Sequence, residues 1–288
     1  SQPPPCHAAL LQLPELTSGP FDATGDLVRL SVSRDHVAVL ELNDVAHFNA
    51  LGKELTADLG AAFTFALQQP MVVGISLQAA GPHFCIGGNP FAQQAAGITV
   101  AALSSELLSS AQLCCGLRSS RLPVVASVHG HVAGGGIALS MNAAYRLAEA
   151  RSSFEHGNLP RGVCPVAEFS HTLISTVGIV HATTLYLTNM TIDAATALSI
   201  GVVDSVASGT RITQNQARRV ALCACAVLPR SSWTLPSADP SVLAQEARGH
   251  AECRVANGGE VSAVGSFVAA DYSQLFDLSC DAEVVELH

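Results

Sequence analysis

Residues 129–140 have the sequence HGHVAGGGIALS, in which three consecutive glycines open an apolar stretch with helical spacing. The strand-like segment 123–128, PVVASV, runs directly into this stretch. Glycine lets a backbone approach a ligand closely and adopt positive φ. The first N–H groups of a helix lack intrahelical partners and lie at the positive end of its dipole. The stretch therefore predicts a turn in which backbone N–H groups meet a negative oxygen.

A second loop of the same kind comes earlier in the chain. The short apolar strand 72–78, VVGISLQ, leads into residues 81–90, GPHFCIGGNP, which we call the first glycine loop. One N–H group from each loop would hold a single developing oxyanion, so no charged side chain would be needed there. The alternative is that these glycines only allow tight turns and close helix packing. A dinucleotide site is disfavoured, because neither loop has the pattern GxGxxG.

The segments around the two loops alternate between strand and helix patterns. Alternating residues predict a strand hairpin at 27–32 and 36–42, and apolar spacing predicts a helix at 51–68 with Lys53 and Glu54 outward. Further elements are expected as a helix at about 101–117, a strand at 145–149, helices through most of 166–200 and a strand at 201–206. This order predicts an α/β fold with parallel strand pairing.

Four segments resemble the crotonase (enoyl-CoA hydratase/isomerase) superfamily. They are 49–51 (NAL), 84–89 (FCIGGN), 125–154 and 187–206, and together they extend the resemblance over roughly residues 27–210. The resemblance implies a spiral core of repeated ββα units, a C-terminal helical region and a homotrimer or hexamer. It also implies an acyl thioester substrate on coenzyme A or on the phosphopantetheine arm of an acyl carrier protein, with no tightly bound cofactor.

The domain organisation follows from composition and from the resemblance. Residues 1–25 are rich in proline and turn formers and are interpreted as a linker or N-terminal tail. Residues 26–210 form the expected crotonase core. A second shift in composition at 230–241 lies within residues 211–288, the expected C-terminal helical region for trimerisation or for covering the site.

The resemblance also implies roles for individual residues. It places the oxyanion hole on the N–H groups of Ile86 and Gly135. The backbone around His47 and Phe48 falls where the family holds adenine and pantetheine. Other residues expected to contact the substrate are Cys85, Gly87, Gly134, Ala138 and Arg161. For Cys85 a buried packing thiol is the alternative, and for Arg161, a candidate carboxylate anchor, an ordinary surface position.

The sequence departs from the family's hydratases at the acid–base positions. Their two glutamates correspond here to Ala138 and Asn158, neither of which is a general acid or base. An aspartate frequent after the first glycine loop is replaced by Asn89. Simple hydration is therefore disfavoured. Decarboxylation is the leading prediction, because loss of CO2 creates the thioester enolate without a base.

A subgroup with this profile acts in polyketide β-branching on an acyl carrier protein. The lysine that this subgroup uses is absent here, because the matching position lies near Gln94. The C-terminal histidine of the subgroup is best matched by His250. His156 is a second candidate proton donor, and Asn158 is a candidate to hydrogen-bond the substrate carboxylate or a water. The alternatives are hydration, dehydration or isomerisation using His156 or Glu155, and a non-catalytic acyl-binding domain.

Composition excludes several other classes of protein. The net charge is −9 and there is no basic run, so nucleic acid is not an expected partner. No apolar run has membrane-spanning length. The nine cysteines include no CxxC pair, which predicts free thiols in the cytoplasm or another reducing compartment and no metal site. Arginines 211, 218 and 219 are either a docking patch for a carrier protein or a solvated helix face.

Overall fold

The computed structural model describes residues 27–88, 99–227 and 239–256. The predicted tail at 1–25, Asn89, Gln94 and the segments 228–238 and 257–288 lie outside the described residues. None of the helices within the described ranges is long and apolar enough to cross a membrane.

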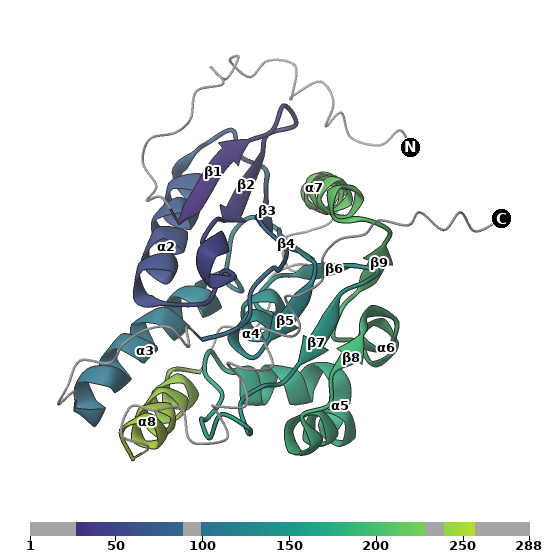
Figure 1. Ribbon diagram of the computed structural model, residues 1–288. Coiled ribbons are helices and arrows are strands. Elements are labelled where there is room, and N and C mark those ends of the chain that lie inside the picture. The colour runs from purple at the N-terminus through teal and green to yellow at the C-terminus, as the bar shows by residue number, and fades with distance from the viewer. Residues whose placement is uncertain (1–26, 89–98, 228–238, 257–288) are drawn as a thin grey trace.

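A six-stranded sheet forms the centre of the fold (Figure 1). Its strands, in spatial order, are β1 (Val28–Val32), β2 (Val37–Leu42), β3 (Gly74–Ala79), β4 (Val124–Val128), β6 (Tyr145–Glu149) and β9 (Ser205–Ala207). Only the β1–β2 pair is antiparallel, and the four following pairs are parallel. This confirms the α/β class, the hairpin and the parallel pairing that the sequence pattern predicts.

A second sheet of three short strands was not expected from the sequence. It consists of β5 (His131–Ala133), β7 (Ser153–Glu155) and β8 (Ile192–Asp193). The prediction of helix through most of 166–200 is confirmed by α5 (Phe169–Thr188) and α6 (Ala194–Ile200), and β8 lies in the short gap between them. Strands of two or three residues are too short to show a period of two, and these exist because distant segments pair.

Helices cover both faces of the main sheet. The helices of the described residues are the 3-10 helix η1 (Val45–His47) and the α-helices α2 (Lys53–Gln68), α3 (Val100–Gly116), α4 (Gly135–Met141), α5 (Phe169–Thr188), α6 (Ala194–Ile200), α7 (Thr210–Val227) and α8 (Pro240–Ala256). Figure 1 shows α2 and α7 on opposite sides of the sheet, where α2 packs on β1 and β2 and α7 on β3, β4 and β6. Helix α8 packs against α3, far from it in the sequence.

The core explains why these segments are apolar. Leu40 lies opposite Leu30 on β1 and Leu77 on β3, and all three are buried. Phe84 in the first glycine loop, Phe154 on β7 and Phe169 at the start of α5 are almost completely buried and belong to the same core. Burial of each such side chain contributes about 1.5–3 kcal/mol. The backbone of the two glycine loops is therefore held by a packed core.

Candidate active site

The two glycine loops lie against each other. They follow β3 and β4, which are neighbouring parallel strands, so both loops leave the sheet at the same edge. A bridge joins Cys85 to Val132, and the N–H of Ala133 donates to the carbonyl of Cys85 at 3.2 Å. The first glycine loop therefore runs alongside β5 and the start of α4.

Glycine is required at this junction for two different reasons. A Cβ on Gly136 would lie 2.1 Å from the carbonyl oxygen of Cys85, which is closer than any real contact. Gly87 has φ of +100°, in the region that side chains rarely adopt, and a Cβ there would lie 3.3 Å from the nitrogen of Gly135. The two backbones approach this closely only because the side chains are missing.

Two backbone N–H groups at this junction have no hydrogen-bond acceptor among the described residues. Among the described residues, no hydrogen bond engages the N–H of Ile86 or of Gly135. Their neighbours are engaged: the N–H of Gly87 faces Sγ of Cys85 at 3.5 Å, and that of Gly134 donates to the carbonyl of Glu155 at 3.0 Å. Two unpaired donors on touching loops have the arrangement that stabilises an oxyanion.

The segment after β2 forms one wall of the junction. The N–H of Leu51 donates to the carbonyl of Gly87 at 2.6 Å, and Cδ1 of Leu51 would lie 3.1 Å from a Cβ on Gly135. The amide of Asn49 donates to the carbonyls of Ala80 and His83 at 2.9 Å each. Sequence reasoning used the NAL motif only as a family signal and missed this structural role of Asn49 and Leu51.

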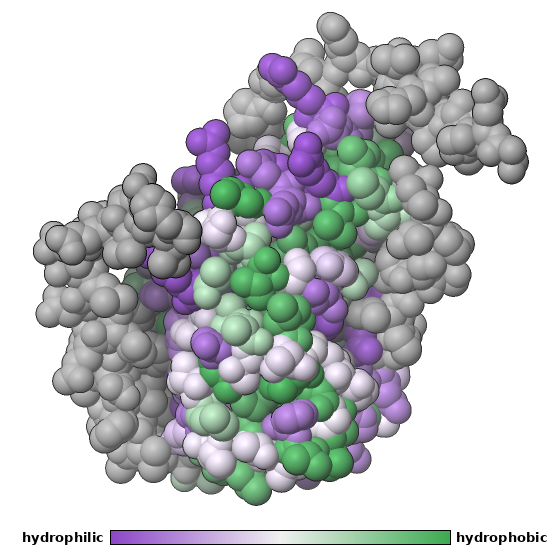
Figure 2. All heavy atoms as spheres, turned by 90° about the vertical axis from the view of Figure 1, so that its right-hand side faces the viewer, coloured by the Kyte–Doolittle hydropathy of each residue, from purple (hydrophilic) through white to green (hydrophobic). Residues whose placement is uncertain are grey.

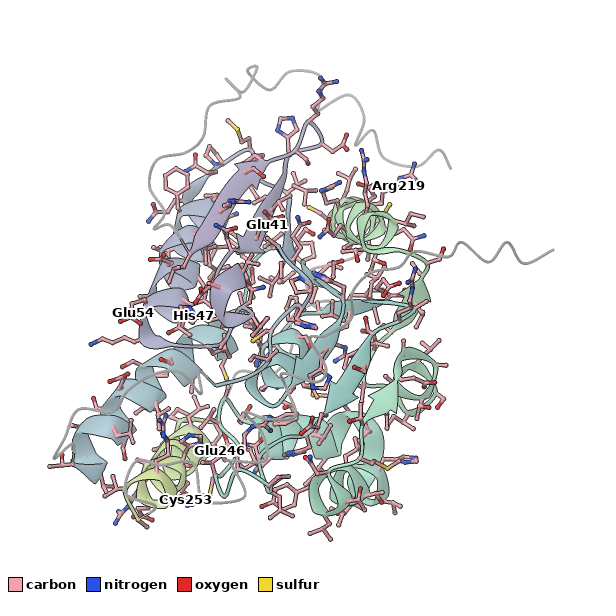
Figure 3. All side chains as sticks on the ribbon, viewed as in Figure 1. Glu41, His47, Glu54, Arg219, Glu246 and Cys253 are labelled. Atoms are coloured by element: carbon pink, nitrogen blue, oxygen red, sulfur yellow. The ribbon has the colours of Figure 1, made fainter. Side chains whose placement is uncertain are left out.

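His47 and Phe48 lie at the outer end of this wall. His47 is on η1, where its Nδ1 lies 2.8 Å from Oδ1 of Asp44 and its side chain is about half exposed (Figure 3). Phe48 adopts a left-handed conformation with φ of 54°, and its ring meets that of His83 edge-on at 5.7 Å. Both residues are therefore held beside the first glycine loop.

The loop at residues 156–165 forms the opposite wall and brings Asn158 to Gly134. A Cβ on Gly134 would lie 3.4 Å from the carbonyl of His156 and 3.6 Å from Oδ1 of Asn158. Nδ2 of Asn158 donates to the carbonyl of Cys164 at 3.1 Å, which fixes the orientation of the amide. Its Oδ1 is buried and accepts no hydrogen bond from the described residues.

His250 reaches the same loop from α8. Its Nδ1 lies 2.7 Å from the carbonyl of Cys164, the oxygen that also accepts from Asn158. A carbonyl only accepts, so Nδ1 carries the hydrogen and the lone pair of the neutral ring is on Nε2. Burial lowers the pKa of His250, which keeps the ring neutral at pH 7. The structure thus brings together two of the residues singled out from sequence, Asn158 and His250.

The side chain of His156 packs against aromatic residues. Its ring stacks on Phe169 at 4.7 Å and meets Tyr186 edge-on at 5.0 Å. It lines a mostly apolar cavity together with Glu155 and with Ile137, Phe154, Phe169, Leu173, Leu185, Ile192 and Val202. Burial lowers the pKa of His156 to about 4. A ring that is neutral at pH 7 has no proton to donate as an imidazolium.

Glu155 and Arg161 are engaged with each other and with neighbours. Glu155 accepts from Asn189 at 2.8 Å and lies 3.4 Å from His131 and 3.5 Å from Arg161. Burial alone would raise the pKa of Glu155, but the hydrogen bonds from His131 and Asn189 and the charge of Arg161 lower it to about 2. Arg161 also donates to the carbonyl of Gly157. The carboxylate of Glu155 and the guanidinium of Arg161 are therefore both engaged in contacts that stabilise this loop.

Ala138 and Cys85 lie behind the junction. Ala138 is one turn into α4 and is buried in the core, and the Cys85 side chain is completely buried. Burial raises the pKa of the Cys85 thiol to about 12, so it stays protonated at neutral pH. Of the two interpretations of Cys85, the packing thiol fits this geometry. Across the described ranges, no group of three or more histidine, cysteine or acidic residues is placed to hold a metal ion.

The stability of this region is expected to depend on pH through His83. Nδ1 of His83 accepts a hydrogen bond from the N–H of His131 at 2.9 Å, and burial followed by the charges of His131 and His129 lowers its pKa to about 4. Because the unfolded chain takes up this proton first, the stabilisation is complete above pH 6.5 and is lost as pH falls towards 4. His156, whose pKa is shifted in the same direction, adds to the loss.

Unfolding by urea at several pH values between 7.5 and 4 checks this. His83→Asn keeps an acceptor for His131 and is expected to flatten the dependence in part. His181→Asn, at an exposed histidine on α5, is the matched control and should keep the wild-type slope. Equal slopes for His83→Asn and wild type would contradict the assignment.

Comparison with known proteins gives a consistent family. A family model described as enoyl-CoA hydratase/isomerase matches residues 33–227. "Probable enoyl-CoA hydratase EchA14" of Mycobacterium tuberculosis is 31% identical over 182 residues, covering 63% of this chain and 70% of that protein. "Mevalonyl-coenzyme A hydratase SIDH" of Beauveria bassiana is 30% identical over 183 residues, covering 62% and 65%. An enoyl-CoA hydratase structure from Mycobacterium avium superposes with a TM-score of 0.69 at 25% identity, covering 86% and 98%.

Proposed function

The chain belongs to the enoyl-CoA hydratase/isomerase family, and from this we propose that it binds an acyl-CoA thioester and stabilises its enolate. The observation that carries the proposal is the pair of unpaired N–H groups, of Ile86 and Gly135, on two touching loops. Both would donate to the thioester oxygen, which gains negative charge as the enolate forms. Donors fixed by a packed core need no reorganisation when that charge appears.

The proposed carrier of the acyl group is coenzyme A. The relatives are named for coenzyme A thioesters, and the half-exposed segment at His47 and Phe48 lies beside the first glycine loop. The candidate patch for an acyl carrier protein is less well placed. Arg219 lies on α7, away from His47 and η1 (Figure 3), and Arg218 donates to Asn215. No tightly bound cofactor is required by this scheme.

The proposed reaction is hydration, dehydration or double-bond isomerisation of an enoyl thioester. The names of the relatives support this class better than the decarboxylation favoured from sequence. Neither Ala138 nor Asn158 transfers a proton, Glu155 is held by three partners, and His156 lines an apolar cavity. His250 is therefore proposed as the proton-transfer group, with Nε2 as the base and Asn158 as the neighbour that positions the loop.

Decarboxylation remains a second candidate because one specific observation favours it. The two positions at which family hydratases carry glutamates hold a buried Ala138 and the amide of Asn158. Loss of CO2 from a glutaconyl-type thioester creates the enolate directly, and only one proton has to be delivered afterwards. The oxyanion hole would serve this reaction equally.

Mass spectrometry of thioesters incubated with the protein separates the candidates. We expect a gain of 18 mass units from an enoyl-CoA, or a loss of 18 from a 3-hydroxyacyl-CoA, and His250→Gln should lose most of this turnover. A loss of 44 from a glutaconyl-CoA would select decarboxylation instead. No change in any of these thioesters would reject the proposed enzyme and favour a non-catalytic acyl-binding domain.

We also propose that the chain assembles as a homotrimer or a hexamer built from trimers. Large apolar side chains are exposed on α5, α6 and the turn between them: Ile174, Ile179, Val180, Leu187, Met190 and Leu198. Figure 2 shows hydrophobic side chains gathered over the lower half of the face on which these helices lie in Figure 1. Further copies of this chain are the proposed occupants, and light scattering of the full chain would give their number.

A further inference from the structure

Two free cysteines face each other across the packing of α8 on the 156–165 loop. Sγ of Cys164 lies 3.8 Å from Sγ of Cys253, although the residues are 89 positions apart in the sequence. Cys164 belongs to the loop that carries Asn158, and Cys253 lies in the last turn of α8. A Cβ on Gly249 would lie 3.2 Å from Sγ of Cys164, so this sulfur rests on the helix surface.

Two contacts made by α8 before Cys253 fix the register of this helix. The carboxylate of Glu246 accepts from the N–H groups of Glu168 at 2.6 Å and Ser170 at 3.2 Å. One turn later, Nδ1 of His250 meets the carbonyl of Cys164 at 2.7 Å. Glu246 and Cys253 thus project from the same helix (Figure 3). A disulfide needs its sulfurs about 2.05 Å apart, so they must approach by roughly 1.8 Å, a movement within reach of side-chain rotation.

The pair also differs from the other cysteines in its accessibility. Cys85, Cys114 and Cys115 are buried, and burial raises the pKa of each thiol to about 12. Cys164 and Cys253 are only partly buried, so a small oxidant can reach them. Burial and the contact with Cys253 raise the pKa of Cys164 to about 11. At neutral pH this side chain is therefore a protonated thiol and not the nucleophilic thiolate.

We propose that Cys164 and Cys253 form a reversible disulfide that clamps the 156–165 loop to α8 and closes the site. With a small-molecule disulfide as oxidant, one cysteine thiolate attacks it, forms a mixed disulfide and releases one small thiol. The second thiolate attacks the protein sulfur of that mixed disulfide and releases the other small thiol. Two protein thiols are oxidised to one disulfide and the oxidant is reduced to two thiols.

The clamp would act on the site through the contacts of the loop. The carbonyl of His156 and Oδ1 of Asn158 pack on Gly134, and Oδ1 of Asn158 is buried. Because this oxygen is buried against Gly134, contact of an acyl group with Asn158 would require the loop to move away from the triple-glycine turn. A covalent bond from Cys164 to α8 opposes that movement. This consequence rests on the proposed function, whereas formation of the disulfide does not.

The test is to equilibrate the full chain with oxidised and reduced glutathione at a series of ratios. Peptide mapping without reduction is expected to show a 164–253 cross-link, a loss of two hydrogens, and a melting temperature higher by about 5–10 °C. Cys164→Ser and Cys253→Ser should each lose the cross-link. Cys223→Ser, at an exposed cysteine on α7, is the matched control and should keep it.

A second readout tests closure of the site. The absorption of a cinnamoyl-CoA shifts to longer wavelength when its carbonyl is polarised, and oxidation is expected to weaken its binding at least tenfold, with recovery on reduction. A cross-link at other cysteines, or none at any ratio, would overturn the clamp. A 164–253 cross-link with unchanged affinity would overturn closure. If the reduced protein does not bind the thioester, the proposed function fails while the mapping still decides the clamp.

Discussion

Gly135→Pro is expected to lower thioester turnover about 10²–10³-fold, the usual effect of removing one oxyanion donor. Proline has no N–H, and it is tolerated at the first position of a helix, which Gly135 occupies in α4. The added Cβ would meet Cδ1 of Leu51 at 3.1 Å, the far end of a flexible side chain, and the backbone of Gly87 at an ordinary 3.5 Å. The fold should therefore survive while the donor is lost.

Gly135→Ala is the matched control, because it adds the same Cβ and keeps the N–H. The red shift of bound cinnamoyl-CoA reports carbonyl polarisation without requiring turnover, so it should shrink in Gly135→Pro and persist in Gly135→Ala. Circular dichroism and melting temperature check that both variants are folded. A full red shift and normal turnover in folded Gly135→Pro would remove the N–H of Gly135 from the oxyanion hole.

Gly136→Ala is expected to destabilise the protein by about 3 kcal/mol or more, although it adds a single methyl group. That methyl would lie 2.1 Å from the carbonyl oxygen and 2.9 Å from the carbonyl carbon of Cys85, both backbone atoms that cannot rotate away. The first glycine loop must then move, and the hydrogen bond from Ala133 to Cys85 is the first contact at risk.

Gly88→Ala provides the comparison, since a Cβ there would have no heavy atom of the described residues within 4 Å. It is expected to stay within about 0.5 kcal/mol of wild type. The free energy of unfolding from denaturant titration measures both variants. Equal stability of Gly136→Ala and Gly88→Ala would show that the backbones of the two loops are not in contact at Gly136 and Cys85.

Several features of the fold and site were predictable from the sequence because they depend on local pattern. The alternating residues of β1 and β2, the apolar spacing of α2 and the glycines at the ends of β3 and β4 predict parallel α/β units with two adjacent glycine loops. The family resemblance over roughly residues 27–210 is confirmed by the model that matches residues 33–227. Short strands such as β5 and β8 have no such pattern and were missed.

What the site residues do was decided only by packing between distant segments. His156 and His250 were both candidate proton donors from the sequence, but His156 is stacked on Phe169 and His250 shares a carbonyl with Asn158. Glu155 was an alternative acid–base group from the sequence, but three neighbours hold it ionised in the fold. Protonation depends on burial and on charges within a few ångströms, and those neighbours come from parts of the chain that only the tertiary fold brings together.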